Sequence, residues 1–223
     1  MKGKTFPSLD YERRLWAKGY CCVAGLDEAG RGAWAGPVVA AAVVLPPGEP
    51  ETVSQLSGVN DSKQLSPARR ENLLECIRAH ALGVAIGAVP PDEIDRIGIV
   101  PATRKAMNLA LEALGSDGRV AGADHLLIDH LRLPEQPLPQ ISLPKGDTRV
   151  LSIAAASIVA KVSRDRMMVD LDVELPGYGF ARHKGFGTPQ HQAALSARGP
   201  TAAHRLSCAP LRRRGAVVGK AGY

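Results

Sequence analysis

Two adjacent carboxylates, Asp27 and Glu28, follow a short apolar segment and precede a glycine-rich turn. Carboxylates at the mouth of a sheet repel each other unless a positive charge binds there, so a metal ion or a nearby arginine is the expected partner. On a regular strand the two side chains would point to opposite faces. Both can serve one site only if the strand ends or bends here. Otherwise Glu28 contributes only its backbone carbonyl, or the pair is structural.

The turn that follows begins with Gly30, Arg31 and Gly32 and ends at Gly36. Its spacing is GxGxxxG instead of the GxGxxG of a dinucleotide-binding loop, and Pro37 opens a β-branched segment where that loop needs a helix. This pattern excludes a nucleotide cofactor. Glycines at such a turn instead let backbone N–H groups approach a phosphate or a sugar closely.

Two more carboxylates occur at positions where α/β proteins often carry function. Asp129 ends the apolar segment 125–129, and Asp147 lies in a Lys-Gly-Asp turn ahead of a long alanine-rich segment. Each has an ordinary structural role open to it, since Asp129 could cap or close a turn and Asp147 could cap the following helix. Lys145, two residues before Asp147, makes a phosphate-facing site equally reasonable.

Cations that could hold a phosphate backbone occur in two further loops. Lys63 belongs to an Asn-Asp-Ser-Lys loop that could also be no more than a turn. Lys184 and Phe186 lie in an Arg-His-Lys-Gly-Phe run, which places two cations and an aromatic ring within five residues. That combination suits a phosphate together with a sugar or base face.

The net charge of +6 is distributed unevenly along the chain. Residues 175–223 contain eight Lys or Arg and no Asp or Glu, whereas residues 1–174 contain 20 basic and 22 acidic residues. An acid-free basic segment on a near-neutral body indicates a polyanionic partner. The run Arg212–Arg214 alone is equally compatible with a solubilising tail, and the glycines around it predict poor order.

The apolar pattern predicts an α/β fold with a mixed central sheet flanked by helices. The nearly continuous apolar run 38–45 indicates a strand buried on both faces. Ser66 and Pro67 form an N-cap and a favoured first helical residue. The expected strands are 22–26, 38–45, 82–89 and 125–129, and the expected helices are 66–80, 101–114, 150–171 and 189–197. Three early strands followed by alternating helices and strands give the mixed sheet.

Length and composition favour one globular domain. The 223 residues are 45% apolar and 4% aromatic, so the core rests on aliphatic side chains. No apolar run approaches the roughly 18 residues of a membrane span, and the N-terminus lacks the apolar block of a secretory signal. The four cysteines form no CxxC pair. Reduced thiols and a cytoplasmic location are therefore expected.

Taken together and in order, the motifs closely resemble bacterial ribonuclease HII over residues 20–211. Each motif alone is weak, but the ordered set with family-like spacing is specific. The matching segments are Gly25–Gly32, Ala35–Leu45, Asn60–Leu65, Lys145–Asp147, Ile153–Lys161, Pro176–Phe180 and His183–Gly185.

The resemblance implies a ribonuclease H-like fold with a small helical C-terminal part. It implies an endonuclease that cuts the RNA strand of RNA–DNA hybrids and single ribonucleotides embedded in duplex DNA. Asp27, Glu28, Asp129 and Asp147 match the family's catalytic carboxylates. They would hold two Mg²⁺ or Mn²⁺ ions, with Asp27 nearest both, and the products would carry 5′-phosphate and 3′-hydroxyl ends. The 30–32 turn matches the segment whose backbone reads the ribose 2′-hydroxyl.

Two positions depart from the family pattern. His130 stands where the family usually has glycine after the third carboxylate, so its side chain would crowd the site or add a phosphate contact. Phe186 stands where the family usually has tyrosine, an aromatic residue that helps to choose the junction. These departures bear on specificity and rate more than on the class of reaction.

The same resemblance organises the chain and leaves two alternatives. Residues 1–19 are an N-terminal extension, 20–174 the catalytic core, 175–211 a basic substrate-binding segment and 212–223 a basic tail. A monomer is expected. The alternatives are a ribonuclease HIII-type hybrid nuclease and a nucleic-acid-binding module without catalysis. The first carboxylate at Asp27 leaves no room for the longer N-terminal region of ribonuclease HIII, and the presence of all four carboxylates argues against the module.

Overall fold

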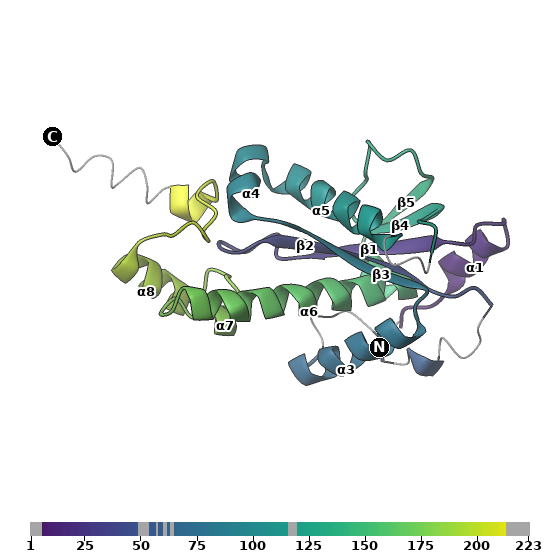
Figure 1. Cartoon of the computed structure of the whole chain (residues 1–223), viewed down its shortest axis with the longest axis horizontal. Coiled ribbons are helices and arrows are strands. Elements are labelled where there is room, and N and C mark those ends of the chain that lie inside the picture. The colour runs from purple at the N-terminus through teal and green to yellow at the C-terminus, as the bar shows by residue number, and fades with distance from the viewer. Residues whose placement is uncertain are drawn as a thin grey trace, which may run out of the picture.

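A five-stranded mixed sheet forms the centre of the computed structural model, which describes residues 6–48, 54–56, 58–59, 62, 65–115 and 120–212 (Figure 1). The strands are β1 (Val23–Ala29), β2 (Val38–Val44), β3 (Gly83–Val89), β4 (His125–Asp129) and β5 (Gln140–Leu143), in the order β3-β2-β1-β4-β5. β3, β2 and β1 are antiparallel neighbours, whereas β1, β4 and β5 are parallel. The expected α/β fold with a mixed sheet is confirmed.

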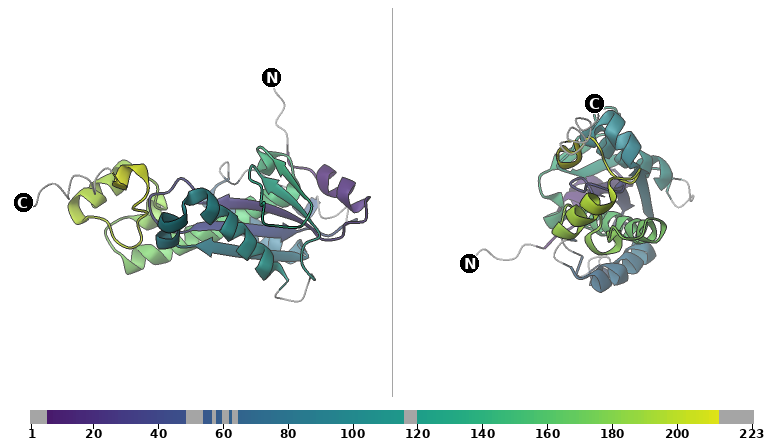
Figure 2. Two further views of the ribbon diagram at one scale, coloured as in Figure 1. Left: turned by 90° about the horizontal axis from the view of Figure 1, so that it is seen from above. Right: turned by 90° about the vertical axis from the view of Figure 1, so that its left-hand side faces the viewer.

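Helices cover both faces of this sheet (Figure 2). One face carries α4 (Pro91–Ile97) and α5 (Ile99–Leu114), and the other carries α3 (Pro67–His80) and α6 (Leu151–Glu174). At one end of the molecule lies α1 (Asp10–Trp16), and at the opposite end α7 (Phe180–His183) and α8 (Pro189–Arg198) form a small helical part. No helix in the described ranges has both the length and the apolar character needed to cross a bilayer.

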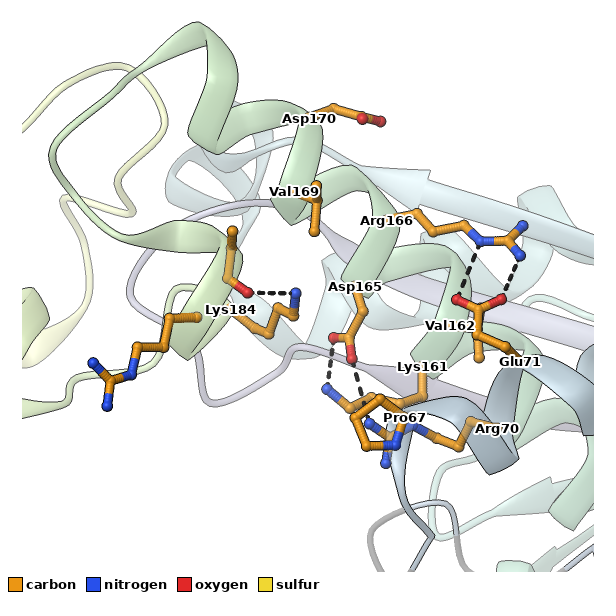
Figure 3. Close-up of a pocket in the computed structure, with 12 residues that line it drawn as sticks. Pro67, Arg70, Glu71, Lys161, Val162, Asp165, Arg166, Val169, Asp170 and Lys184 are labelled. Atoms are coloured by element: carbon orange, nitrogen blue, oxygen red, sulfur yellow. Dashed lines mark hydrogen bonds and ion pairs between the residues drawn. The ribbon is translucent and has the colours of Figure 1, made fainter.

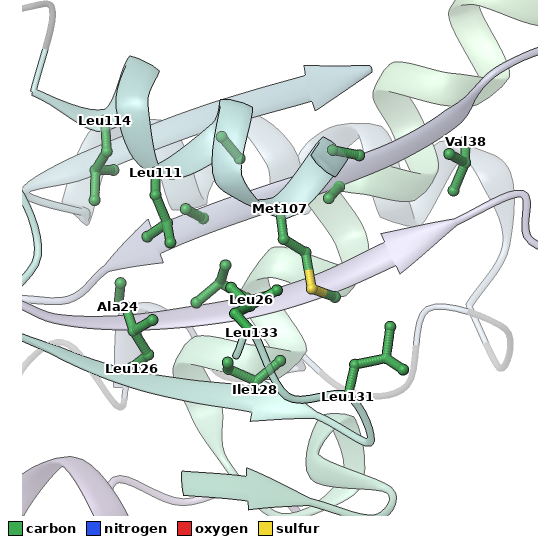
Figure 4. Packing of buried hydrophobic residues seen from close by; sticks show 14 of the residues in the cluster. Ala24, Leu26, Val38, Met107, Leu111, Leu114, Leu126, Ile128, Leu131 and Leu133 are labelled. Atoms are coloured by element: carbon green, nitrogen blue, oxygen red, sulfur yellow. The ribbon is translucent and has the colours of Figure 1, made fainter. Parts of the chain in front are cut away.

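Side-chain alternation along β2 produces two cores. All seven residues of the strand are buried. The even-numbered residues from Val38 to Val44 contact α5, while Ala41 and Val43 contact α3 and α6. Figure 4 shows the first core, where Met107 and other side chains of α5 point at the sheet. A strand covered on both faces needs no polar positions, which explains the continuous apolar run in the sequence.

The expected strands and helices are present, with ends shifted by at most three residues. The predicted cap of α3 is confirmed, because the Ser66 hydroxyl accepts a hydrogen bond from the Arg69 N–H at 3.3 Å. The sequence did not predict α1, α4, α7, β5 or the 3-10 turn η2 (Gly146–Thr148). These elements are three to seven residues long, which is too short for an apolar period to repeat.

The long helix α6 lies very close to β1. A Cβ atom at Gly25 would lie 2.3 Å from the carbonyl carbon of Ser152 and 2.5 Å from the backbone nitrogen of Ile153. Only glycine permits this contact between the two backbones. The first turns of α6 are almost entirely buried and rich in alanine, which allows the same close approach along the helix.

The start of α6 is capped by a side chain from the N-terminal part of the chain. Glu12 of α1 is fully buried, and its carboxylate accepts a hydrogen bond from the Ser152 N–H at 2.9 Å. The neighbouring segment is fixed as well, since the Leu151 N–H donates to the Ser8 carbonyl at 3.0 Å. Burial raises the pKa of Glu12 above its ordinary value. The residues before β1 are therefore joined to the body of the protein.

Replacing Glu12 tests this cap. Glu12→Gln keeps an oxygen acceptor for the Ser152 N–H and removes a charge that burial disfavours, so its free energy of unfolding at pH 7 should equal or exceed that of the wild type. Glu12→Ala leaves the buried N–H unpaired and should cost about 2 kcal/mol. Urea unfolding of the three proteins checks this, and equal stability of the Ala and Gln variants would contradict it.

Candidate active site

Asp27 and Glu28 lie inside β1 and not after it. The strand continues to Ala29 because Asp27 and Glu28 are paired with Ala41 and Ala40 of β2. The expectation that the strand ends at residue 26 is therefore wrong. The physical reason is that β2 extends the antiparallel ladder past both carboxylates.

The Asp27 side chain is held from the α6 side of the sheet. Only 6% of the residue is exposed. Its carboxylate accepts hydrogen bonds from the Ser157 hydroxyl of α6 and, at 2.7 Å, from the Glu28 backbone N–H. The Ser157 hydroxyl also bonds to the Ser62 hydroxyl at 2.9 Å. These contacts give the Asp27 carboxylate a fixed orientation.

Asp129 lies beside Asp27 because β1 and β4 are parallel neighbours. Leu26 is paired with Ile128, so the next residue on each strand is an aspartate. Burial raises the pKa of Asp27 well above its ordinary value, and the charges of Glu28 and Asp129 raise it further. Asp27 and Asp129 therefore lie on neighbouring parallel strands near the end of β4, with Glu28 close enough for its charge to act on Asp27. The ends of parallel strands are where α/β proteins commonly bind ligands.

The fourth carboxylate, Asp147, is carried toward this edge by η2. The Gly146 N–H donates to the Asp129 carboxylate at 2.6 Å, which joins η2 to the end of β4. Asp147 is the next residue and is 7% exposed. Asp147 is not the N-cap residue of α6, which is Val150, and the Ser152 N–H in the first turn of the helix donates to Glu12. The capping alternative for Asp147 therefore fails.

Positive charge reaches these carboxylates unequally. Glu28 forms an ion pair with Arg31 at 3.2 Å. A nearby arginine is one of the two positive partners expected from the sequence for this pair of carboxylates. Neither Asp27 nor Asp129 forms an ion pair with any cation in the part of the chain that the structure describes. The pair of aspartates is therefore the place where an added cation would relieve the most repulsion.

The donor chemistry suits a divalent metal ion. Carboxylate oxygens are the ligands that Mg²⁺ and Mn²⁺ prefer. Burial is the main cause of the raised pKa of Asp27, and the repulsion from Glu28 and Asp129 that adds to it is what such an ion would relieve. Within the described ranges, no three His, Cys, Asp or Glu side chains are already gathered around one point. The residues fit a divalent metal ion by the chemistry of their donor atoms.

A pocket of about 530 Å³ opens beside the carboxylates. It is lined by Glu28, by the turn residues Gly30, Arg31 and Gly32, and by Phe186. Phe186 is 40% exposed, so it is not a core residue, and a Cβ atom at Gly32 would lie 3.8 Å from its ring. The structure brings the glycine turn and the aromatic ring to the edge of one pocket.

The lysines expected to contact phosphates are placed differently. Lys184 lines a neighbouring groove of about 510 Å³ between α3, α6 and α7, where its ammonium group donates to the Ala181 carbonyl at 2.7 Å (Figure 3). Lys145 is exposed and precedes η2 with a left-handed backbone, φ 56°. Lys63 and its neighbours Asn60 and Asp61 lie outside the described residues. Lys145 and Lys184 therefore do not line the pocket that contains Phe186.

Two further cations, Arg70 and Lys161, line both the pocket and the groove. Lys161 bonds to Asp165 at 2.6 Å, and Arg70 contacts the same carboxylate at 3.7 Å (Figure 3). Asp165 therefore pairs with one cation of its own helix and with one of α3. Sequence reasoning did not single out Arg70 or Lys161 as site residues, although Lys161 ends one of the matching motifs.

Buried histidines hold Phe186 in the C-terminal part. Nδ1 of His191 lies 3.0 Å from the Phe186 carbonyl, and its Nε2 lies 3.1 Å from Nε2 of His204. Nδ1 of His204 accepts a hydrogen bond from the Thr201 N–H at 3.0 Å. All three contacts are satisfied when His191 is protonated on Nδ1 and His204 on Nε2, so both rings are neutral.

Sequence reasoning also missed side chains that support the pocket from behind. Ser157 contacts Asp27, while Arg164 and Arg205 are only 1% and 2% exposed and bond to the glycine turn. An arginine in a sequence looks like a surface residue. The one available signal was spacing, since Ser157 and Arg164 are seven residues apart and so lie on one face of a helix.

Comparisons with known proteins point to one family. Residues 24–210 match a family model described as ribonuclease HII. A ribonuclease HII from Chloroflexus aurantiacus is 53% identical over 205 residues, which cover 92% of this chain and 94% of that protein.

Solved structures share the fold. The crystal structure of the ribonuclease H2 from Pyrococcus horikoshii OT3 aligns with a TM-score of 0.70 and 26% identity, covering 89% of this chain and 99% of that one. Bst-RNase HIII in complex with Mn²⁺ aligns with a TM-score of 0.64 and 24% identity, covering 89% of this chain and 70% of that one. The expected ribonuclease H-like fold is confirmed.

Acid should loosen the C-terminal part. Burial lowers the pKa of His191, and it lowers the pKa of His204 from 6.5 to about 4, helped by the nearby His191. As the pH falls below the ordinary histidine pKa, the unfolded chain binds protons that the folded chain excludes. The free energy of unfolding should therefore fall by up to about 1.4 kcal/mol per pH unit for each histidine.

Urea unfolding between about pH 7.5 and pH 5 measures this slope. His204→Gln removes one of the two groups and should flatten the dependence. His130→Gln replaces an exposed histidine and is the matched control. A slope that is the same in the wild type and in His204→Gln would contradict the assignment.

Proposed function

The chain belongs to the ribonuclease HII family and is a metal-dependent ribonuclease H, and we propose that it cleaves both the RNA strand of RNA–DNA hybrids and single ribonucleotides embedded in duplex DNA. The observation that carries this proposal is the meeting of Asp27 and Asp129 beside a pocket bordered by the 30–32 turn and Phe186. A site for cations thereby adjoins a surface suited to one sugar of a nucleic acid strand.

We assign the catalytic and metal-binding roles to Asp27, Glu28, Asp129 and Asp147. Two divalent ions, Mg²⁺ or Mn²⁺, would supply an activated water and stabilise the leaving 3′ oxygen, giving 5′-phosphate and 3′-hydroxyl ends. Asp27 would be shared, because the charges of both Glu28 and Asp129 act on its carboxylate. Bst-RNase HIII, which shares the fold, has been solved in complex with Mn²⁺, and this supports a divalent ion at the site.

The surroundings of Asp27 prepare it for this role. Ser157 and the Glu28 N–H hold its carboxylate in one orientation, so the side chain loses little rotational freedom when a cation binds. Its raised pKa means that a proton competes with the metal ion for the same oxygens. Metal affinity should therefore fall as the pH is lowered.

Recognition of the ribose is assigned to the glycine turn and Phe186. Gly30 and Gly32 carry no side chain, so the backbone N–H groups of the turn can reach a 2′-hydroxyl. Phe186 presents an exposed apolar ring at the same pocket, and that ring would pack on a sugar of the cleaved strand. Phenylalanine supplies this face without the hydroxyl of a tyrosine.

Contacts with the phosphate backbone are assigned to lysines in three parts of the chain and to the basic C-terminal segment. Lys63, Lys145, Lys184 and the basic segment 175–211 would supply contacts that are independent of sequence. The tail 212–223 would add non-specific attraction, and its residues 213–223 lie outside the described residues. Binding by such contacts weakens as the salt concentration rises.

The family identity separates the alternatives. The matching model is that of ribonuclease HII, and identity is 53% to a ribonuclease HII but 24% to Bst-RNase HIII. A module without catalysis is disfavoured because the four carboxylates are all present. We further propose that the enzyme acts as a monomer in the cytoplasm.

Asp27→Asn tests the metal-binding assignment. The substitution keeps the shape of the side chain and removes a charge that the ions require, so we expect a loss of activity of about a hundredfold or more. Binding of the duplex should be largely kept, because phosphate contacts supply most of the affinity.

The assay is cleavage of a duplex with one embedded ribonucleotide in Mg²⁺, in Mn²⁺ and in EDTA, with fluorescence anisotropy for binding. Asp92→Asn, at an exposed position in α4, is the control and should cleave like the wild type. Substantial cleavage by Asp27→Asn in Mg²⁺ would rule out its role.

Phe186→Ala tests the reading of the junction. Losing the stack should reduce the preference for a single embedded ribonucleotide over a uniform hybrid by about fivefold or more, since stacking is worth about 1–3 kcal/mol. Phe186→Tyr should change that ratio less, because one neutral hydrogen bond is worth about 1 kcal/mol. Val173→Ala alters another exposed apolar side chain and is the control. If Phe186→Ala folds and the ratio stays constant, the ring has no part in recognition.

A further inference from the structure

Two arginines are buried behind the glycine turn without an acidic partner. Arg164 is 1% exposed and Arg205 is 2% exposed. Neither forms an ion pair with any residue that the structure describes. Burial lowers the pKa of each to about 10, and the proximity of Arg164 contributes to the shift at Arg205. Burying such groups costs free energy unless their donors are satisfied.

The guanidinium group of Arg205 donates hydrogen bonds to the carbonyl groups of the turn. Nη1 donates to the Gly30 carbonyl at 2.7 Å and to the Arg31 carbonyl at 3.0 Å. Nε and Nη2 both donate to the Gly36 carbonyl, at 2.9 and 2.8 Å. The planar fork of one guanidinium group thus holds both ends of the turn, which the single ammonium group of a lysine could not do.

Arg164 connects the same turn to the segment that carries Phe186. Nε donates to the Pro37 carbonyl at 2.8 Å, Nη2 to the Ala35 carbonyl at 3.1 Å, and Nη1 to the Lys184 carbonyl at 2.9 Å. Its guanidinium carbon also lies 5.8 Å from the centre of the Phe186 ring. One side chain therefore fixes the aromatic ring relative to the turn.

The packing explains a glycine of the turn. Gly30 has φ 92°, and a Cβ atom there would lie 1.9 Å from Nε of Arg164. Glycine is therefore required both by the backbone angle and by the arginine behind it.

The carbonyl contacts determine where the N–H groups of the turn point. In a trans peptide group the C=O and the following N–H point in opposite directions. The carbonyls of Gly30 and Arg31 point at Arg205, so the N–H groups of Arg31 and Gly32 point away from it. Neither of these N–H groups donates a hydrogen bond to another described residue. They are the donors that would be free for a 2′-hydroxyl.

We propose that Arg164 and Arg205 are positioning residues for ribonucleotide recognition. Arg205 orients the backbone donors of the turn, and Arg164 holds Phe186 beside them. The proposal rests on the proposed function of this pocket. Two unpaired positive charges behind the turn also favour the approach of a phosphate group from the front.

Arg205→Lys is the decisive variant, because it keeps the charge and removes the fork. The measurement is the ratio of cleavage rates for a single embedded ribonucleotide and for a uniform RNA–DNA hybrid, with thermal unfolding to verify the fold. We expect the ratio to fall about tenfold, since misplacing the recognition donors affects the isolated ribonucleotide most. Tyr178→Phe removes a 2.8 Å hydrogen bond to the Gly199 carbonyl in the same C-terminal part, and its ratio should stay at the wild-type value.

A second variant decides the matter if Arg205→Lys does not fold. Asp95 of α4 anchors the residues after Arg205, accepting hydrogen bonds from the Leu206 N–H at 2.7 Å and the Ser207 N–H at 3.0 Å. Asp95→Ala should lower the ratio in the same direction by a smaller factor. An unchanged ratio in folded Arg205→Lys, or in Asp95→Ala if the former is unfolded, overturns the proposal. A wild type that cleaves neither substrate would instead refute the proposed function itself.

Discussion

The close packing of α6 against β1 is the constraint on which the rest of the structure depends. At Gly25 the two backbones are too close for any side chain to fit between them. A rigid helix held at this point delivers side chains to fixed positions along its length. The Ser152 N–H donates to the Glu12 carboxylate, and the Ser157 hydroxyl donates to the Asp27 carboxylate. Further along the same helix, Arg164 donates to the Ala35 carbonyl in the turn after β1. The distance between the edge of the sheet that carries Asp27 and the glycine turn 30–36 is thereby set by two turns of one helix.

The candidate site combines two costly electrostatic features within one region. Asp27 is buried beside two other carboxylates, and Arg164 and Arg205 are buried near each other. The arginines are satisfied internally by backbone carbonyls. Asp27 and Asp129 also accept hydrogen bonds from backbone N–H groups, but neither forms an ion pair with a described residue, so a bound cation would relieve their repulsion. The repulsion between these buried carboxylates lowers the stability of the fold at the place where a cation would bind, and such a trade-off is common at functional sites.

The C-terminal part holds the glycine turn 30–36 through backbone hydrogen bonds. The Trp34 N–H donates to the Gly185 carbonyl, the Gly36 N–H donates to the Ala203 carbonyl, and the Arg205 N–H donates to the Trp34 carbonyl, each at 2.8 Å. The turn is thus held on one side by α6 and on the other by residues 185–205. Its conformation depends on segments that are far apart in the sequence, and neutral His191 and His204 hold Phe186 in the same assembly.

The sequence by itself predicted a mixed sheet, four of its five strands and the long helices, and it named four carboxylates as candidates for the site. Continuous apolar runs such as 38–45, the Ser66 cap and the motif spacing are local signals that survive without knowledge of the fold. The end of β1 was misjudged, because ladder hydrogen bonds to β2 override the local change to charged residues. Short elements such as α1 and β5 carry too few residues to show a period.

Only the tertiary structure decided which residues meet. Asp27 and Asp129 are adjacent because two strands far apart in the chain are parallel neighbours, and no residue type predicts that register. Arg164 and Arg205 look like surface cations in the sequence, and they are buried because the turn offers them carbonyl groups. Burial, pKa shifts and hydrogen-bond partners are properties of an arrangement in space. A one-dimensional pattern can name the reactive groups, but the packing of α6 and the C-terminal part fixes where they point.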